Sequence, residues 1–330
     1  MKHLLVLCSK KKKFGLTTAI IDIEATNIKT LKNICRGTTS SGGYSELIEI
    51  AKEEGIESVA SALMTGLPYE SLNTFIDTLE FVSTIKNLDA INLYPLMFKP
   101  SDAVFHQRRN DPSIFSTPKE KDLMMILAKE ILGRAGFSES PSHFYTKKSH
   151  IPKQQNSKAQ SKTLLGLGPA SFGFIDMESR GIQYMNYPDL DRYALSVKSA
   201  KTGQWRNSLV DSRSYKVRRF IFLLNSFDSV PNEIVEELKN GKEGKYFSDA
   251  LSSLINLNLI NSNNQGIKLT EKGQLRNSEI IYFLCDREFL SWNFNDSEYE
   301  LLKKYEFFPS ISKDNEVLFD KTLEQQPNLY

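Results

Sequence analysis

The side chains best suited to catalysis or to metal binding are few in this sequence and widely spaced. The three cysteines are Cys8, Cys35 and Cys285, so no two have the short spacing typical of zinc or iron–sulfur ligands. The four histidines form no H-x-x-x-H or H-E-x-x-H pair; they are His3, His106, His143 and His150. The sequence contains no P-loop and no G-x-S-x-G nucleophile. It therefore predicts no metal site and leaves the catalytic residues unassigned.

The composition is that of a globular protein. Hydrophobic residues make up 40% and charged residues 25% of the 330 residues, a length that corresponds to about two domains. The net charge is +2, so no overall field attracts nucleic acid, and we expect no nucleic-acid partner. No apolar run approaches the roughly 18 residues of a membrane-spanning helix. Lys10 to Lys13 follow the short apolar run Leu4 to Leu7, the reverse of the order in a secretory signal. We expect a cytoplasmic protein without a membrane partner.

Strand-like and helix-like patterns alternate from residue 17 to about residue 175. Short connections between such elements favour a parallel sheet, open or rolled into a barrel. Ligands on parallel sheets bind at the carboxyl ends of the strands, so the residues just after each strand are the candidates. The predicted strands are 19–23, 58–64 and 90–96, with an extended stretch at 137–145, and the predicted helices are 28–34, 45–54, 70–84 and 119–135.

The chain beyond these elements has three further features. The segment Lys147 to Lys162 is basic and without periodicity, which is typical of a loop and allows a lid over the strand ends. The apolar run Leu164 to Ile175 contains three glycines, which indicates close approach of the backbone to another element or to a ligand. The last third predicts helices at 218–225, 232–238 and 247–257 and then a hairpin at 259–269, an order typical of a winged-helix module.

Several short motifs, in this order, resemble the oxygen-independent coproporphyrinogen III oxidase family of radical S-adenosylmethionine (SAM) proteins. Ile21 to Arg36 is similar to the family's "GVQSF…LK.IGR" stretch, and Ser61 to Pro68 (SALMTGLP) to its "DLIYGLP" strand end. The later matches are Asn92 to Leu96 with "LYPL", Arg134 to Phe137 with "AGY", Gly166 to Ile175 with "GLGAGAHSY", Asn186 to Tyr193 with "N..DL..Y", and the 269–273 wing. The resemblance covers residues 19 to 285.

The resemblance implies an α/β fold, with a partial (half) TIM-type parallel barrel followed by a mainly helical, winged-helix-like domain. The expected divisions are an unmatched segment 1–16, a partial barrel with its connecting segment at 17–206, and a C-terminal domain with its tail at 207–330. The first strand, 19–23, is then the edge of the sheet, with residues 1–16 lying against it or disordered.

The resemblance also implies SAM as a cofactor. Glu24 stands at a polar SAM contact of the family, and Arg36 at an arginine near the SAM, where it could bind the carboxylate. Met64 and Tyr94 fall at strand-end positions lining the cofactor pocket, and Phe172 at an apolar position near the adenine. Ala62 stands where the family usually has Asp. Core packing explains Met64, Tyr94 and Phe172 equally well, and Arg36 is the strongest candidate.

The sequence departs from the family at the iron–sulfur cluster. The family holds a 4Fe–4S cluster with a CxxxCxxC loop; this loop is absent, and the family's Gly-Gly segment that binds the SAM amino group has no counterpart in the resemblance. One reading is a radical SAM oxidoreductase that decarboxylates porphyrin propionates in heme biosynthesis, or the C-terminal part of one. Lys147–Lys162, Arg108 and Arg109 would then face the propionates, although a solvated surface explains these cations as well. The other reading is a non-catalytic heme-handling relative, a partner of a separate N-terminal half, or a C-methyltransferase-like protein.

Overall fold

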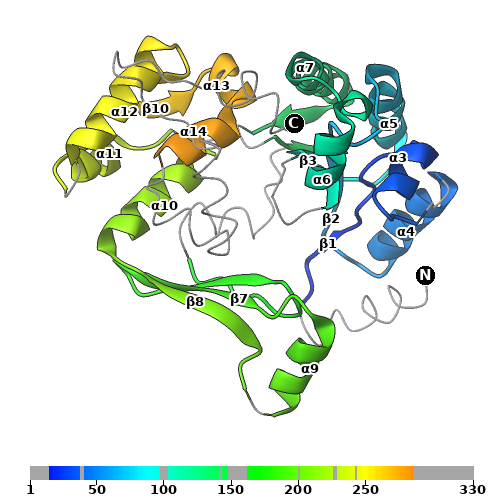
Figure 1. The fold of residues 1–330 in the computed structure, drawn as a ribbon, viewed down its shortest axis with the longest axis horizontal. Helices are drawn as coiled ribbons and strands as arrows, with labels where there is room; N and C mark the ends of the chain where they lie inside the picture. The colour runs from blue at the N-terminus through cyan, green and yellow to red at the C-terminus, as the bar shows by residue number, and fades with distance from the viewer. Residues whose placement is uncertain are drawn as a thin grey trace. The chain divides into compact units, whose positions relative to one another are not determined.

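The chain forms two compact units. The computed structural model describes residues 15–37, 41–96, 103–140, 143–147, 162–199, 201–225, 229–241 and 244–284. The first unit comprises Met1–Pro152 with Asp320–Tyr330, and the second comprises Lys153–Phe319. The described residues of the first unit therefore lie within 15–147 and those of the second within 162–284 (Figure 1).

The first unit is built on a five-stranded mixed sheet in the order β1-β2-β3-β5-β4. The strands are β1 Thr18–Ile20, β2 Ser58–Thr65, β3 Ala90–Pro95, β4 Phe137–Glu139 and β5 Phe144–Lys147. β1, β2 and β3 are parallel, and their registers pair Ala19 with Val59 and Met64 with Tyr94. Among the described strands β1 lies at the edge of this sheet, as predicted, whereas residues 1–14 lie outside the described part.

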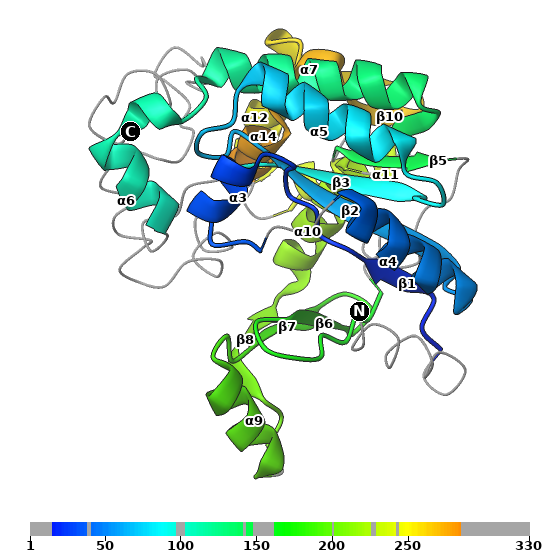
Figure 2. The same cartoon turned by 90° about the vertical axis from the view of Figure 1, so that its right-hand side faces the viewer.

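Five helices belong to the described part of this unit, and the sequence predicts four of them, all but α6. The helices are α3 Ile28–Asn33, α4 Ser41–Glu53, α5 Leu72–Thr84, α6 Ala103–Asn110 and α7 Pro118–Arg134, with a 3-10 turn at Pro112–Ile114. Figure 2 shows α5 and α7 side by side over the sheet. Ser71 and Thr117 begin these two helices with reciprocal capping boxes, which satisfy backbone N–H groups at the helix start. On the apolar face of α5, the side chains of Phe75, Leu79 and Val82 are fully buried.

The prediction that all strands of this part are parallel is wrong for β5. β5 pairs antiparallel with β3, and β4 pairs antiparallel with β5, so β4 runs in the same direction as β3. The physical reason is the length of the connection, because a parallel crossover needs about a dozen residues or more. Only the short segment 140–143 separates β4 from β5, and this is enough for a reversal but not for a crossover.

The second unit contains a three-stranded antiparallel sheet in the order β6-β7-β8. Its strands are β6 Phe172–Asp176, β7 Gly181–Asn186 and β8 Gln204–Val210, and α9 Leu190–Lys198 lies between β7 and β8. A side chain at Gly173 would overlap the ring of Tyr184, so the close backbone approach predicted for the glycine-rich run is present, against a neighbouring strand. The Tyr184 hydroxyl accepts a hydrogen bond from Gly166 N at 2.9 Å, and Asn186 Nδ2 donates to Gly168 O at 2.9 Å.

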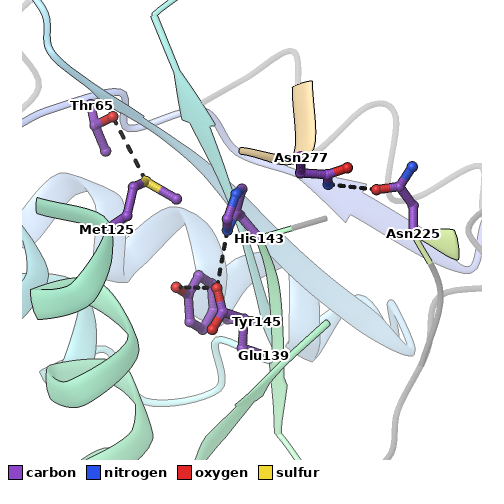
Figure 3. Close-up of polar contacts among 7 residues, drawn as sticks. All are labelled: Thr65, Met125, Glu139, His143, Tyr145, Asn225 and Asn277. Carbon is purple, nitrogen blue, oxygen red and sulfur yellow. Dashed lines mark hydrogen bonds and ion pairs between the residues drawn. The ribbon is translucent and has the colours of Figure 1, made fainter. Parts of the chain in front are cut away.

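The rest of the second unit is mainly helical. Its elements are α10 Ser212–Leu224, α11 Asn232–Lys239, α12 Gly244–Asn256, the hairpin strands β9 Ile260–Asn263 and β10 Gly266–Leu269, α13 Glu271–Leu275 and α14 Asn277–Leu284. One apolar core joins them, with Phe220, Ala250 and Leu254 completely buried in it. Asn277 Nδ2 donates a 2.5 Å hydrogen bond to Asn225 Oδ1 and so links the ends of two helices (Figure 3).

Two side chains of α10 connect this helical part to the three-stranded sheet. The Tyr215 hydroxyl donates to Asp176 Oδ1 at 3.0 Å, and the Arg218 guanidinium lies 4.0 Å from the centre of the Phe174 ring. These contacts explain why residues 162–206 belong to the second compact unit. The predicted domain boundary after residue 206 is a different division and stays a prediction. None of the helices in the described ranges combines the length and the apolar character that a membrane-spanning segment requires.

Candidate functional site

The chain that leaves β1 continues along β2 and brings Glu24 to the carboxyl-terminal half of that strand. Ile23 N and Glu24 N both donate to Ala62 O, at 3.1 and 2.9 Å, and Met64 N donates to Glu24 O at 3.0 Å. Glu24 has a positive φ of 63°, an uncommon conformation for a residue that carries a side chain. The backbone contacts therefore hold this carboxylate at a fixed place on the sheet.

Arg36 reaches Glu24 from the far end of α3. Asn27 caps this helix by accepting a bond from Thr30 N, and Arg36 N donates to Leu31 O at 2.9 Å, which closes the chain back on the helix. The Arg36 Nη2 atom then lies 2.7 Å from Glu24 Oε1. The sequence analysis places these two residues together through the resemblance alone, and the structure brings them into contact.

The Glu24 and Arg36 side chains differ in burial. The Arg36 side chain is 54% exposed and that of Glu24 only 9%. Burial raises the pKa of Glu24; the charge of Arg36 opposes this rise, and the nearby charge of Asp22 adds to it. The exposed guanidinium carries several N–H donors, so it can bind a ligand while one of them remains on Glu24.

Two other predicted residues, Met64 and Tyr94, lie opposite each other at the ends of β2 and β3. Tyr94 is 52% exposed, and burial of its hydroxyl together with the charges of Asp22 and Glu24 raises its pKa. Tyr94 therefore lies in the electrostatic field of the Glu24 site. Met64 is half-buried and packs against the apolar cluster that includes Leu67, which fits the packing interpretation.

Phe172 belongs to the second unit, at the start of β6, where it is 52% exposed. Its predicted role beside the adenine stays a prediction. The two arginines proposed to face propionates differ, because Arg109 is exposed whereas Arg108 is buried near the Phe115 ring. Burial makes Arg108 unsuitable for an exposed substrate contact. Of the basic segment, residues 148–161 lie outside the described part.

Glu70 is a buried carboxyl group that the sequence analysis does not single out. It follows β2, and its Oε2 atom accepts bonds from Gly66 N at 2.8 Å and Leu67 N at 3.3 Å. Burial raises its pKa to about 8, against a lowering effect of these two bonds. The signal available in the sequence is an acidic residue four positions after a turn glycine, and it indicates a turn-stabilising contact.

His143 has a structural role on the sheet. It is buried beside Glu139 and Tyr145, with its Nδ1 atom 3.1 Å from Glu139 Oε1, and the Tyr145 hydroxyl donates to the same oxygen at 2.8 Å (Figure 3). Thr65, at the end of β2, donates to the sulfur of Met125 on α7 in the same view. His143 therefore satisfies a buried polar group of the sheet.

The part of the chain that the structure describes offers no ligand set for an iron–sulfur cluster. Among the described residues Cys35 is the one cysteine, and it is exposed and free. Within these residues no group of three His, Cys, Asp or Glu side chains could hold a metal ion. Cys8 and Cys285 lie outside the described part, 27 positions before and 250 positions after Cys35. A cubane needs several converging thiolates, so the residues present do not fit the cluster.

The fold and the site define an α/β protein with a polar, partly exposed pair at the carboxyl-terminal side of parallel strands. No family model matches the chain, and no curated protein matches it. A solved structure with a similar fold is coproporphyrinogen III oxidase from Escherichia coli, a radical SAM enzyme, at 18% sequence identity and a TM-score of 0.66. The match covers 85% of this chain and 66% of that chain, so this chain spans slightly less than two thirds of its length. The comparison shows a similar fold and agrees with the resemblance described from the motifs.

Proposed function

We propose that the Glu24–Arg36 site binds S-adenosylmethionine. The observation that carries this proposal is the 2.7 Å pair of a buried carboxylate and a half-exposed guanidinium beside parallel strand ends. A guanidinium is the preferred partner of a carboxylate, and SAM carries an α-carboxylate. Glu24 and Asp22 offer acceptors for its ammonium or ribose hydroxyl groups, and Tyr94 and Met64 lie on the adjoining strand ends. The residues present therefore fit SAM, although they do not fit the cluster.

The proposal extends to the architecture and the chemical class. We interpret β1, β2 and β3 as part of a TIM-type barrel, and α10 to α12 with the β9–β10 hairpin as a winged-helix-like module. The parallel register and the helix–hairpin order support these assignments. By the same similarity the substrate class is a porphyrin with propionate side chains, in a cytoplasmic protein of heme biosynthesis. In such chemistry SAM supplies a carbon radical after reduction by a cluster, and that cluster would have to come from another polypeptide segment.

A non-catalytic role is the second candidate, and the spacing of the cysteines favours it. In that case the chain handles heme or completes a separate N-terminal half. The remaining alternative is that the chain is itself a radical SAM C-methyltransferase-like protein. A neighbouring reading frame that encodes CxxxCxxC and Gly-Gly supports the enzyme, whereas an unrelated one supports the binding role. Anaerobic reconstitution of the full chain with iron and sulfide tests the same point. A cysteine-dependent cluster signal from this chain alone would contradict our interpretation of the cysteines.

Titration calorimetry tests SAM binding directly. Arg36→Ala removes the charge-assisted contact and should weaken SAM binding ten-fold or more, the equivalent of about 1.5–3 kcal/mol. Lys32→Ala is the matched control, since it removes an exposed cation from the last turn of α3 and should leave the affinity unchanged. Equal SAM affinity in the wild type and in Arg36→Ala would remove Arg36 from the site. Absence of SAM binding by the wild type, even with a cluster-bearing partner supplied, would reject the proposal.

A further inference from the structure

Asn92 is a buried polar residue on the same face of the sheet as Tyr94. It lies in β3, whose backbone is paired with β2 on one side and with β5 on the other. Because side chains alternate along a strand, Asn92 projects on the face that also carries Tyr94, two residues nearer the carboxyl end. Asn92 is 7% exposed and Tyr94 is 52% exposed. With the backbone covered on both sides, the small exposed area of Asn92 belongs to its side chain.

The amide of Asn92 has no hydrogen-bond partner among the residues that the structure describes. The residues in register with it are Ala62 of β2 and Phe144 of β5, and neither side chain has a polar atom. Ala60, Ala90 and Phe144 form a buried apolar cluster toward the start of the strands. Since buried amides normally have hydrogen-bond partners, an amide without one on this face indicates that a ligand supplies the partner.

Asn92 and Glu24 lie on opposite sides of β2. The chain at Glu24 is bonded to β2 through Ala62 O, and Asn92 of β3 is in register with Ala62. Neighbouring strands are about 4.8 Å apart, so the two backbone positions are separated by roughly 9.6 Å. A nucleoside with an amino-acid tail is large enough to span this separation, with its charged end at the Glu24–Arg36 pair and its neutral end at Asn92. The exposed Tyr94 ring offers a stacking surface on the same face.

We propose, on the basis of the proposed SAM site, that Asn92 binds the polar edge of the adenine and so sets the base specificity of that site. A carboxamide offers two N–H donors and an acceptor oxygen. Adenine presents an amino donor beside a ring-nitrogen acceptor, and asparagine can pair with both at once. The carboxylate of the ligand stays with Arg36, so the charged and the neutral ends of the ligand are recognised by different residues.

Paired changes in the ligand and in the protein isolate this contact. The probes are S-adenosylhomocysteine and its analogue with hydrogen in place of the 6-amino group, which share the carboxylate, ammonium and ribose groups. In titration calorimetry we expect the full wild-type chain to bind the analogue about ten-fold more weakly, since the amide oxygen loses its partner. Asn92→Ala should bind the two probes with equal, weaker affinity. Asn256→Ala is the control, because this asparagine is exposed on α12, and it should keep the wild-type discrimination.

The outcomes separate the role of Asn92 from SAM binding. Equal affinity of the wild type for both probes would overturn the role of Asn92 and leave SAM binding intact. A discrimination that survives in Asn92→Ala, even with weaker binding of both probes, would place the amide on a group that the probes share and would also overturn it. Binding of neither probe by the wild type would overturn both proposals.

Urea denaturation tests a merely structural role for Asn92. Asn92→Leu replaces the amide by an apolar group of similar shape, so it should unfold at an equal or higher urea concentration than the wild type. A lower unfolding midpoint would show that the amide is satisfied within the folded chain, and would overturn the proposed contact with a ligand.

Discussion

Two buried carboxyl groups follow neighbouring parallel strands, and they differ in what surrounds them. Glu24, after β1, is 7% exposed and Glu70, after β2, is 6% exposed. Burial raises the pKa of both. Glu24 faces an exposed guanidinium, whereas Glu70 accepts bonds from the backbone of its own turn. Fixed backbone partners make Glu70 a structural group, and a half-exposed cation makes Glu24 part of a site that a ligand can enter.

The largest expected difference is in the free energy of unfolding. Glu70→Ala leaves Gly66 N and Leu67 N without their acceptor in a buried turn, and we expect a loss of about 2–4 kcal/mol. Glu24→Ala should cost less than about 1 kcal/mol, because Arg36 can return to water. Urea denaturation followed by circular dichroism measures both. Equal losses would show that the two carboxyl groups do not differ as we describe.

The second largest expected effect is a pH dependence of the unfolding free energy that arises from Glu70. Its folded pKa of about 8 lies above its ordinary value of 4.5, so between these values the folded state holds a proton that the unfolded state releases. The contribution of Glu70 to stability is therefore fully present below pH 4.5 and is lost as pH rises toward 8, by up to about 1.4 kcal/mol per pH unit. Glu70→Gln keeps an acceptor oxygen but does not titrate, and should flatten this slope. Denaturation curves from pH 5 to 8.5 test this, and an unchanged slope in Glu70→Gln would contradict it.

A smaller effect is expected from the ion pair. Arg36→Ala removes the charge that lowers the pKa of Glu24, so this pKa should rise further. The unfolding free energy at neutral pH should fall by about 0–1 kcal/mol, because the guanidinium is half exposed. The loss should shrink in high salt, whereas that of Glu70→Ala should not. Salt-independent destabilisation by Arg36→Ala, with Lys32→Ala as the control, would indicate a packing role for Arg36.

The smallest effect concerns Tyr94. Burial is the main cause of its raised pKa, and the charges of Asp22 and Glu24 add to it. Glu24→Gln removes one of these charges and should lower the pKa of Tyr94. Alkaline difference absorbance, with Tyr94→Phe identifying the signal, measures it. An unchanged Tyr94 titration would place Glu24 outside the surroundings of its hydroxyl.

Local patterns predict most of the elements of the first unit. The apolar period over α5 and the capping pair Thr117 and Glu120 of α7 are contacts within a few residues, so the sequence shows them directly. The direction of a strand cannot be predicted in this way. The pairing of β5 with β3 joins residues about fifty positions apart, so it produces no periodic pattern in the local sequence. The α6 helix and the antiparallel sheet β6-β7-β8 also escape the periodicity analysis.

The candidate site was predictable only through the resemblance. Glu24 and Arg36 are twelve positions apart, a spacing with no meaning in a helix or a strand. The conformations that bring them together, including the positive φ angles of Glu24 and Cys35, depend on the bonds to β2. Glu70 carries a usable signal in its spacing from Gly66, but its burial depends on residues distant in the chain, including Ser116.

The antiparallel direction of β5 sets the reach of the basic segment that follows it. Lys147 N donates to Asp89 O, so β5 ends beside the start of β3. This is the end of the sheet where the parallel strands begin, whereas Glu24 lies near their carboxyl ends. β2 spans eight residues, so the two ends of the parallel strands are about 26 Å apart. Residues 148–162 extend to roughly 50 Å at most. A chain returning from Lys147 would therefore use about half of that contour length before it arrived at the candidate site. The end of the sheet at which β5 finishes is instead the one where Lys52 and Asp89 form an ion pair.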